Sequence, residues 1–467
     1  MTEQLRILHI NNHDLGGGAA RVAWELHHAQ RKRGHDSWLA VGSRRSEEEQ
    51  ILQIPGIATA WKRACEGMRG KLAPFEREVK GVWRLISLLK TWSVPQRAIE
   101  DLMGRENFYA PGTYKILSQI GYKPDIIHCH NLQGRYFDLR ILPQWSRDIP
   151  TVLTMHDPWL LSGHCTHSFE CDRWKTGCGA CPDLDIFPRI TRDGTRRNWN
   201  RKRNIYRKSR LYVVGDCSWV HERMKESMLG PAVAGSEVIL LGVDLSLFKP
   251  RDKTDIRKQM GLPLDRPVLL FAASTIKRNQ WKDYLTMQEA VKLVGERLGT
   301  GRILFMALGE QAEPIMEENY EIRFFPYETD PVVVAGFYQA SDLYLHAARA
   351  ETFPQAPIES LACGTPVIAT AIGGIPEGIK GLRNGEDGID GDSNTYPEQE
   401  ATGVLVPLGN ARAMAGAIMK LISDNPLRIR LGENARKDCV SRFDQERVVN
   451  QYLALYRSLI GSRSSIG

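Results

Sequence analysis

Residues 342–377 predict a strand, a loop, a helix and a second strand in close succession, the repeating unit of a parallel α/β sheet. Leu343 to Leu345 form a short apolar run that predicts a buried strand. Pro354 stands where the helix would begin, a position that tolerates proline because the first amides of a helix lack intrahelical partners. Gly364 predicts the end of this helix, and Pro366 to Ala369 predict the next strand.

The start of this predicted helix has the features of an anion-binding site. The backbone amides of Gln355 and Ala356 would have no partner within the helix and suit a phosphate. Glu351 and Glu359 flank these amides, and a carboxylate beside a phosphate is costly unless it has another task. Accepting hydrogen bonds from sugar hydroxyls is such a task, because an ionised carboxylate can only accept. The alternative is that two glutamates at this spacing arise by chance.

Two flanking segments, Gly364-Thr365-Pro366-Val367-Ile368 and Gly373-Gly374-Ile375-Pro376-Glu377, argue against chance. With them, the stretch resembles the signature of the retaining glycosyltransferases of family 4, which have the two-domain GT-B fold. The resemblance implies that Glu351 contacts the transferred sugar and that Glu359 holds the nucleotide ribose. It also implies a donor-binding role for Phe353, Gln355 and Ala356. The family usually has glycine where this chain has Pro354, so one amide donor is absent.

Length and composition fit a two-domain enzyme of this kind. At 467 residues the chain is too long for one core and suits two domains of roughly 200 residues each. No run of about 18 apolar residues predicts a membrane span, and the opening MTEQLRILHINN does not resemble a signal peptide. We therefore expect a cytoplasmic location, with peripheral contact to the inner face of the membrane left open. The formal charge of +7 suits an anionic ligand or an anionic lipid surface without choosing between them.

The first strand and helix are joined by a glycine-rich loop. Arg6 to Ile10 predict a strand, and Ala19 to Arg33 predict a helix that ends at Gly34. Between them, Gly17 and Gly18 would let the backbone approach a ligand closely. The resemblance implies that this loop faces the diphosphate of the donor and the acceptor, and the alternative is a tight turn without a ligand.

Polar residues follow two further predicted strands, 125–129 and 151–155. His130 and Asn131 come after the first strand, and His156 and Asp157 come after the second. In open α/β sheets ligands gather at the carboxyl ends of strands, so these side chains are candidates for the acceptor side of a site. A single histidine at a strand end is structural about as often as functional. The resemblance favours His156 as a catalytic residue, because the family has a histidine here that faces the reacting sugar.

A cysteine-rich stretch follows directly, in residues 163–182. Four soft ligands within a short, turn-rich segment suit tetrahedral zinc, and His164 and His167 are possible substitutes. Because the sequence shows no export signal, reduced thiols or metal are favoured over disulfides. A redox pair or unligated thiols remain the alternative. The insertion resembles one in bacterial members of the family that build surface polysaccharides, and we expect a structural clip rather than a catalyst. The four predicted ligands are Cys165, Cys171, Cys178 and Cys181.

Residues 61–105 alternate basic side chains with tryptophan and aliphatic ones. Part of this segment predicts a basic amphipathic helix, the composition of a membrane-surface element. The alternative, given equal weight, is an ordinary solvated helix packed on its own domain. The basic residues are Lys62, Arg63, Arg69, Lys71, Arg77, Lys80, Arg84 and Lys90.

Residues 237–241 predict the last strand of the first half, and the second half of the chain begins with another predicted strand, 268–273. Lys277, Arg278 and Lys282 follow it, and positive charge here suits a diphosphate. Lys282 matches a lysine of the resembling family, whereas the arginine that the family has directly after the strand is missing. Lys277 or Arg278 could replace it. Tyr327 follows a further strand, 322–325, where the family receives the nucleotide base.

Taken together, the sequence predicts two Rossmann-like domains with parallel sheets that face each other across a cleft. The expected bounds are 1–243 for the acceptor-side domain, 244–440 for the nucleotide-sugar domain and 441–467 for a helix that crosses back to the first domain. The resemblance implies retaining sugar transfer from a UDP- or GDP-sugar to a carbohydrate or lipid-linked saccharide, in polysaccharide biosynthesis, with a structural zinc and no catalytic metal. Two alternatives stay open. One is an enzyme of the same fold with other chemistry, an epimerase or phosphorylase, and the other is a non-catalytic sugar- or nucleotide-binding protein. No nucleic-acid-binding motif is present.

Overall fold

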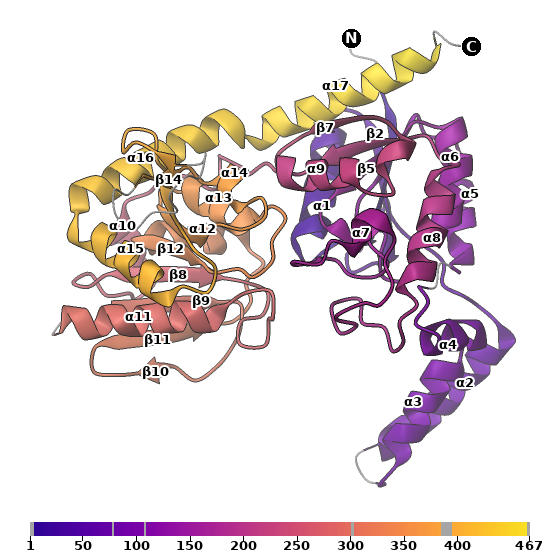
Figure 1. Cartoon of the computed structure of the whole chain (residues 1–467), viewed down its shortest axis with the longest axis horizontal. Helices are drawn as coiled ribbons and strands as arrows, with labels where there is room; N and C mark the ends of the chain where they lie inside the picture. Colours follow the sequence, from indigo (N-terminus) through magenta and orange to yellow (C-terminus); the bar gives the residue numbers. More distant parts are fainter. Residues whose placement is uncertain (1–3, 77–78, 107–108, 300–302, 384–394, 465–467) are drawn as a thin grey trace. The chain divides into compact units, whose positions relative to one another are not determined.

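A computed structural model describes residues 4–76, 79–106, 109–299, 303–383 and 395–464. The chain divides into two compact units (Figure 1). Unit 1 comprises Met1–Gly215, Val220–Val238 and Ala454–Gly467, and unit 2 comprises Asp216–Trp219 and Ile239–Leu453. Among the described residues, no helix is both long and apolar enough to cross a membrane.

Unit 1 is built on a parallel sheet of seven strands in the order β3-β2-β1-β4-β5-β6-β7. The central strands β4 and β5 are buried along their whole length, as their continuous apolar runs predict. The strands are β1 (Arg6–His13), β2 (Asp36–Ser43), β3 (Ile51–Gln53), β4 (Ile126–Cys129), β5 (Thr151–Met155), β6 (Leu211–Gly215) and β7 (Val233–Val238). The helices are α1 (Gly18–Lys32), α2 (Ala60–Leu72), α3 (Val82–Trp92), α4 (Pro95–Leu102), α5 (Ile116–Ile120), α6 (Leu142–Asp148), α7 (Arg173–Thr176), α8 (Thr195–Tyr206) and α9 (Ser218–Glu226).

One predicted strand of this sheet is misplaced. The apolar run 237–241 predicts the last strand of the first half, whereas β7 is Val233–Val238 and pairs with β6. The apolar residues Ile239 and Leu241 are buried, but they follow the strand and belong to unit 2. Burial of a connecting segment therefore produced the same apolar pattern as a strand.

Unit 2 contains a sheet of nine strands in the order β10-β11-β9-β8-β12-β13-β16-β14-β15. All neighbouring strands are parallel except β10 and β11. The strands are β8 (Val268–Ala272), β9 (Ile303–Leu308), β10 (Ile315–Met316), β11 (Tyr320–Phe325), β12 (Leu343–His346), β13 (Val367–Thr370), β14 (Gly381–Leu382), β15 (Thr395–Tyr396) and β16 (Gly403–Val406). The helices are α10 (Lys253–Gln259), α11 (Tyr284–Leu298), α12 (Pro331–Ala340), α13 (Gln355–Ala362), α14 (Ile375–Gly378), α15 (Ala411–Ser423), α16 (Asn425–Arg442) and α17 (Gln445–Ser464), the last of which ends in unit 1.

The core of unit 2 lies between its sheet and the helices α11 and α15. Phe271, Phe305 and Leu345, on adjacent or neighbouring strands, are fully buried in this core together with apolar residues of both helices. Central strands that are apolar on every residue are expected where helices cover both faces of a parallel sheet. This packing holds the carboxyl ends of β8 and β12 in place, and the candidate site is built there.

Candidate functional site

The strand, loop and helix that the sequence predicts around Pro354 are present in unit 2. β12 ends at His346 and α13 begins at Gln355, with Pro354 as its N-cap in an extended conformation. Proline therefore precedes the first helical residue, where the absence of its N–H costs no helical hydrogen bond. The helix ends before Gly364, whose φ of 75° is the left-handed conformation common after helix ends.

Lys282, just before α11, forms an ion pair with Glu351, which lies in the loop after β12. Both side chains are mostly buried, and Nε2 of His346 lies 3.6 Å from the Glu351 carboxylate. Burial favours the neutral acid, but the Lys282 ammonium and His346 outweigh it and hold the pKa of Glu351 at about 2. Burial and Lys282 lower the pKa of His346 to about 4. Near pH 7 Glu351 is therefore a carboxylate and His346 a neutral imidazole.

Glu359 is buried on α13, one helical turn beyond the start of the helix. The phenol of Tyr338 donates a hydrogen bond of 2.9 Å to Oε2 of Glu359. One carboxylate oxygen is thereby tied to α12, which fixes the orientation of the other. The partly exposed residues at the start of α13 are Gln355 and Ala356, as expected for a helix end that presents its amides.

The glycine pair after β13 packs directly against the backbone that carries Glu351. A Cβ atom on Gly373 would lie 1.9 Å from the carbonyl oxygen of Glu351, and one on Gly374 would lie 2.1 Å from that of Thr352. The N–H of Gly374 donates a 2.9 Å hydrogen bond to the same Thr352 carbonyl. Any larger residue at either position would displace the loop that positions the carboxylate.

The other predicted donor residues have different surroundings. Nζ of Lys277 lies 4.4 Å from the ring centroid of Phe324, and Arg278 is exposed. Tyr327 is 53% exposed. Phe353 is buried, with its ring centroid 6.0 Å from that of Phe443, so the structure gives it a packing role. Lys282 is the basic residue of this group that the structure brings to Glu351.

In unit 1, the two predicted strand-end histidines lie against each other. Nδ1 of His130 is 3.0 Å from Nε2 of His156. A third histidine extends the contact into the core, because Nδ1 of His9 lies 3.1 Å from Nε2 of His130. This series of hydrogen bonds ends at Gln30, whose Oε1 is 2.8 Å from Nε2 of His9. His9 and Gln30 come from β1 and α1, and the sequence analysis did not identify them.

The direction of these hydrogen bonds follows from the side-chain amide of Gln30. Oε1 of Gln30 can only accept, so Nε2 of His9 carries the proton. Burial lowers the pKa of His9 to about 4, which keeps the ring neutral and leaves its Nδ1 as an acceptor. His130 then donates from Nε2 to His9 and accepts from Nε2–H of His156.

The remaining predicted residues of unit 1 have structural partners. The Asp157 carboxylate accepts hydrogen bonds from the Trp159 N–H, at 2.8 Å, and from the Gln133 amide, at 2.7 Å. The Asn131 N–H donates to the Asn11 side chain. At the start of α1, Gly17 has a φ of 88° and an added Cβ would meet no heavy atom within 4 Å at Gly17 or Gly18. These glycines therefore border open space.

The cysteine-rich loop brings its predicted ligands near one another without closing a tetrahedral site. Sγ of Cys181 lies 3.4 Å from Nε2 of His164, whose Nδ1 is 3.2 Å from the Pro188 carbonyl oxygen. The N–H of Gly163 donates to Sγ of Cys178 over 3.3 Å. Within the described part of the chain, three or more candidate ligand atoms lie within 4.8 Å of one another at two other places, which are His9, His128 and His130, and His27, His28 and Glu48.

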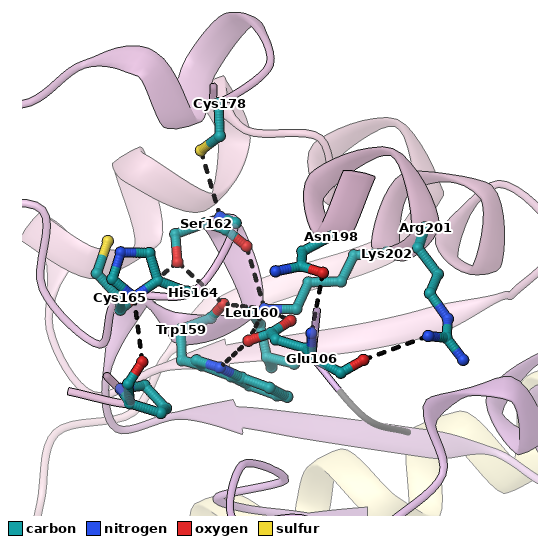
Figure 2. A network of polar contacts seen from close by, with 12 residues as sticks. Glu106, Trp159, Leu160, Ser162, His164, Cys165, Cys178, Asn198, Arg201 and Lys202 are labelled. Atoms are coloured by element: carbon teal, nitrogen blue, oxygen red, sulfur yellow. Dashed lines mark hydrogen bonds and ion pairs between the residues drawn. The ribbon is translucent and has the colours of Figure 1, made fainter. Parts of the chain in front are cut away.

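A buried ion pair that the sequence did not predict links this loop to the segment after His156 (Figure 2). Lys202 on α8 is fully buried, and its Nζ lies 3.0 Å from the Glu106 carboxylate. The same ammonium donates to the carbonyl oxygens of Trp159, at 2.8 Å, and Ser162, at 3.1 Å. Ser162 in turn donates from Oγ to the Cys165 carbonyl oxygen. Lys202 therefore binds together both ends of the segment between Asp157 and the cysteine-rich loop.

Comparison with known proteins agrees with this architecture. Residues 16–247 match the family described as Glycosyltransferase Family 4, and residues 252–438 match Glycosyl transferases group 1. The chain is 30% identical over 370 residues to D-inositol 3-phosphate glycosyltransferase 1 of Catenulispora acidiphila, covering 75% of this chain and 74% of that protein. It is 23% identical over 379 residues to the putative colanic acid biosynthesis glycosyl transferase WcaC of Escherichia coli, covering 78% and 83%.

Solved structures share the fold. The structure of Anabaena Alr3699/HepE in complex with UDP and glucose superposes with a TM-score of 0.61 at 15% identity, over 97% of this chain and 100% of that one. Sucrose-phosphate synthase from Thermosynechococcus elongatus gives a TM-score of 0.59 at 17% identity, over 98% and 100%. Two Rossmann-like units with parallel sheets thus define the GT-B class of glycosyltransferases. Within that class, the chain belongs to the group 1 glycosyltransferases with a family 4 N-terminal region.

Proposed function

We propose that the protein transfers a sugar from a UDP- or GDP-sugar to a carbohydrate or lipid-linked saccharide, with retention of configuration at the anomeric carbon. The observation that carries this proposal is the Lys282–Glu351 ion pair just before the partly exposed start of α13, with Glu359 held in the same helix. An ammonium and helix amides suit a diphosphate, and two carboxylates suit the hydroxyls of a sugar and a ribose.

In this mechanism Lys282 and the amides of Gln355 and Ala356 stabilise the negative charge that develops on the leaving diphosphate. Glu351 is ionised and already engaged by Lys282, which favours a role in orienting sugar hydroxyls over attack on the anomeric carbon. We therefore favour departure of the diphosphate and attack of the acceptor on the same face of the sugar. Glu359, held by the Tyr338 phenol, would accept hydrogen bonds from the ribose hydroxyls.

His156 of unit 1 is proposed to contact the reacting sugar. Nε2 of His156 lies 3.0 Å from Nδ1 of His130, and this contact sets the orientation of the imidazole that would face a sugar hydroxyl. This arrangement supports a positioning contribution, in which the imidazole holds the sugar in one orientation. His130, Asn131 and Asp157 remain candidates for the acceptor side, and Gly17 and Gly18 for the donor side.

Relatives support the class of donor and acceptor. The Anabaena HepE structures contain UDP, glucose or UDP-glucose, and WcaC is named for colanic acid biosynthesis. We accordingly place this enzyme in polysaccharide or glycoconjugate synthesis. A thermal-shift screen of UDP, GDP and ADP, each with and without a sugar, tests the donor, because a ligand that binds only the folded state raises the melting temperature. Failure of every nucleotide at millimolar concentration would contradict the proposal.

The reaction class needs its own measurement. Incubation with the donor that gives the largest shift should release nucleoside diphosphate and transfer the sugar to a saccharide or to water, with the anomeric configuration kept. Conversion of the donor into its epimer would instead support the epimerase alternative. Binding without turnover by any acceptor would support a non-catalytic protein.

We also propose that the cysteine-rich loop holds a structural zinc ion through Cys165, Cys171, Cys178 and Cys181, with His164 as the alternative to one cysteine. The contact between Nε2 of His164 and Sγ of Cys181 supports this, because Nδ1 of the same ring faces a carbonyl oxygen, the usual arrangement that directs the other nitrogen to a metal. The N–H···S hydrogen bond to Cys178 also suits a thiolate. The zinc would clip the loop closed and take no part in the sugar chemistry.

A further inference from the structure

The helix α3 has apolar side chains on two faces, and the side chains of one of these faces are exposed. Val82, Ile86 and Leu89 are half-buried and recur at the spacing of one helical face. Leu85, Leu88 and Trp92 lie on another face, and all three are exposed, with Leu88 at 55%. No residue of α3 is fully buried. A helix that is apolar well beyond its packed face normally has something to cover the remainder.

The neighbouring helix continues the exposed apolar surface. Trp61, Met68 and Phe75 recur every seven residues along α2 and the turn that follows it, so they share one side of the helix, and all three are exposed. The indole of Trp61 donates a 2.8 Å hydrogen bond to the Trp92 carbonyl oxygen, which ties the start of α2 to the end of α3. In Figure 1, α2 and α3 lie side by side and extend away from the sheet of unit 1.

Positive charge surrounds these apolar side chains. Residues 60–92 contain eight lysines and arginines and three glutamates. Arg84 lies beside the ring of Trp83, and Lys80 and Lys90 are exposed at the two ends of α3. Arg77 lies outside the described residues. Long basic side chains next to exposed tryptophans suit the boundary between lipid headgroups and acyl chains, where the apolar stem and the charged end meet different surroundings.

We infer that the hairpin of α2 and α3 docks the protein on an anionic lipid bilayer. The tryptophans and leucines would enter the acyl boundary, while the lysines and arginines would contact the lipid phosphates. The exposed second apolar face supports a membrane element over a solvated helix, because a helix packed only on its own domain is expected to bury that face. The inference does not depend on which sugar the enzyme transfers.

A second copy of the chain is the other occupant to consider for this surface. Residues 60–92 carry five more positive than negative charges, so two hairpins packed face to face would bring two such segments together. Like charges at an interface oppose association. An anionic surface supplies the opposite charge across the whole face, so we favour the bilayer.

Vesicle sedimentation with the full-length protein tests this inference. The protein should bind vesicles of phosphatidylcholine and phosphatidylglycerol at low salt, release from them at high salt, and bind vesicles of phosphatidylcholine alone weakly. The combined change Lys80→Gln, Arg84→Gln and Lys90→Gln should lower the partition coefficient by roughly 100-fold at low salt. The matched control removes three exposed basic residues of unit 2, Arg251, Lys258 and Lys437, and should lower it far less.

The apolar contribution is tested separately. Trp83→Gln with Leu88→Gln should reduce binding at both salt concentrations, whereas Leu285→Gln with Val440→Gln, also exposed helical positions, should leave it unchanged. Because all four side chains are exposed, these variants should fold, and their circular dichroism should match the parent. Equal loss in hairpin and control variants, or no binding to anionic vesicles by the parent, would overturn the inference. So would a dimer in sedimentation velocity that the Trp83 and Leu88 changes dissociate.

Discussion

Nδ1 of His130 lies 3.0 Å from Nε2 of His156, at the carboxyl ends of two adjacent parallel strands. This contact connects the imidazole of His156 to a series of hydrogen bonds that runs from Gln30 through His9 to His130. His9 and His130 each donate from one nitrogen and accept at the other. The tautomer of the part-buried His156 is therefore set by an amide in the core.

Interrupting this series of hydrogen bonds by substitution of His9 should lower turnover without changing nucleotide affinity. His9→Leu removes the acceptor for Nε2–H of His130, whereas His9→Asn can place an amide oxygen near the position of Nδ1. We expect kcat to fall about tenfold or more in the leucine variant and to be largely retained in the asparagine variant. Transfer kinetics and nucleotide titration measure the two effects.

A purely structural role for His9 gives a different result. In that case both variants would lose stability and activity together, and ¹⁵N chemical shifts of labelled histidine would show the same His156 tautomer in each. If the leucine variant keeps the Nε2–H tautomer of His156, the proposed chain of hydrogen bonds does not control it. That outcome would contradict the argument even if activity fell.

The buried histidines should make unit 1 less stable in mild acid. Burial lowers the pKa of His9 to about 4 and holds those of His128 and His130 well below the ordinary value. The unfolded chain, with pKa values near 6.5, then binds more protons, so stability falls as the pH drops below about 6.5. Each histidine contributes a slope of up to about 1.4 kcal/mol per pH unit.

Urea unfolding between about pH 5 and 7.5 measures this slope, in a range where most carboxylates stay ionised. His9→Asn should give a shallower dependence, since one of the titrating groups is removed. A stability that is flat over this interval, or equally steep in the variant, would show that these histidines are protonated in the folded protein.

The two glutamates of the donor site should separate turnover from binding. Glu351→Gln keeps the shape of the side chain but removes the charge that pairs with Lys282, and turnover should fall about 100-fold, with little loss of nucleotide affinity. Glu359→Gln should weaken nucleotide binding, because its proposed partner is the ribose. Glu433→Gln, at an exposed position on α16, is the control. Normal turnover with weakened binding in Glu351→Gln would reverse the two roles.

The cysteine-rich loop should contain one zinc per chain. Elemental analysis of untagged protein should show this stoichiometry, and serine at Cys165, Cys178 or Cys181 should abolish it. His164→Ala and Cys171→Ser decide which of these two residues is the fourth zinc ligand. His167→Ala is the control and should retain zinc, because Nδ1 of His167 accepts from the Phe169 N–H. Metal-free native protein, or a disulfide between any two of the four cysteines, would refute the assignment.

Much of the donor site was predictable because it lies in one continuous stretch. Glu351, Gly364 and Glu359 are near in sequence, and helix and turn rules place them without knowledge of the fold. Lys282 required the resemblance, since its pairing with Glu351 joins two different strand ends. His346 was missed, although it directly follows the predicted strand, Leu343 to Leu345, and could have been noted as a third strand-end histidine.

The supports in unit 1 were not predictable in the same way. The alternation His128, Cys129, His130 indicates that the two histidines share one face of a strand, a signal that could have been used. Nothing local, however, shows that His9 meets His130 from 121 residues away. Lys202 is a stronger case, because it lies in the strongly basic run 195–203, which predicts a solvated helix, and only the packing of α8 buries it.

Removing the buried cation of that helix should be among the most damaging single changes in unit 1. Lys202→Met fills a similar volume but leaves the buried Glu106 carboxylate without its cationic partner and removes the ammonium donor to two carbonyl oxygens. We expect a loss of about 3–5 kcal/mol in the free energy of unfolding. Lys208→Met, at an exposed position just beyond the same helix, should change it by less than about 0.5 kcal/mol.

The double variant Lys202→Met with Glu106→Gln decides whether charge is the cause. Removing both charges should recover part of the stability, because the uncompensated carboxylate is the main cost. Turnover should still be reduced, since Lys202 also holds the Trp159 carbonyl oxygen two residues after Asp157 and three after His156. Denaturant unfolding and transfer kinetics measure these two effects. If Lys202→Met costs less than about 1 kcal/mol, or if the double variant is no more stable than the single one, the ion pair does not hold this segment in place.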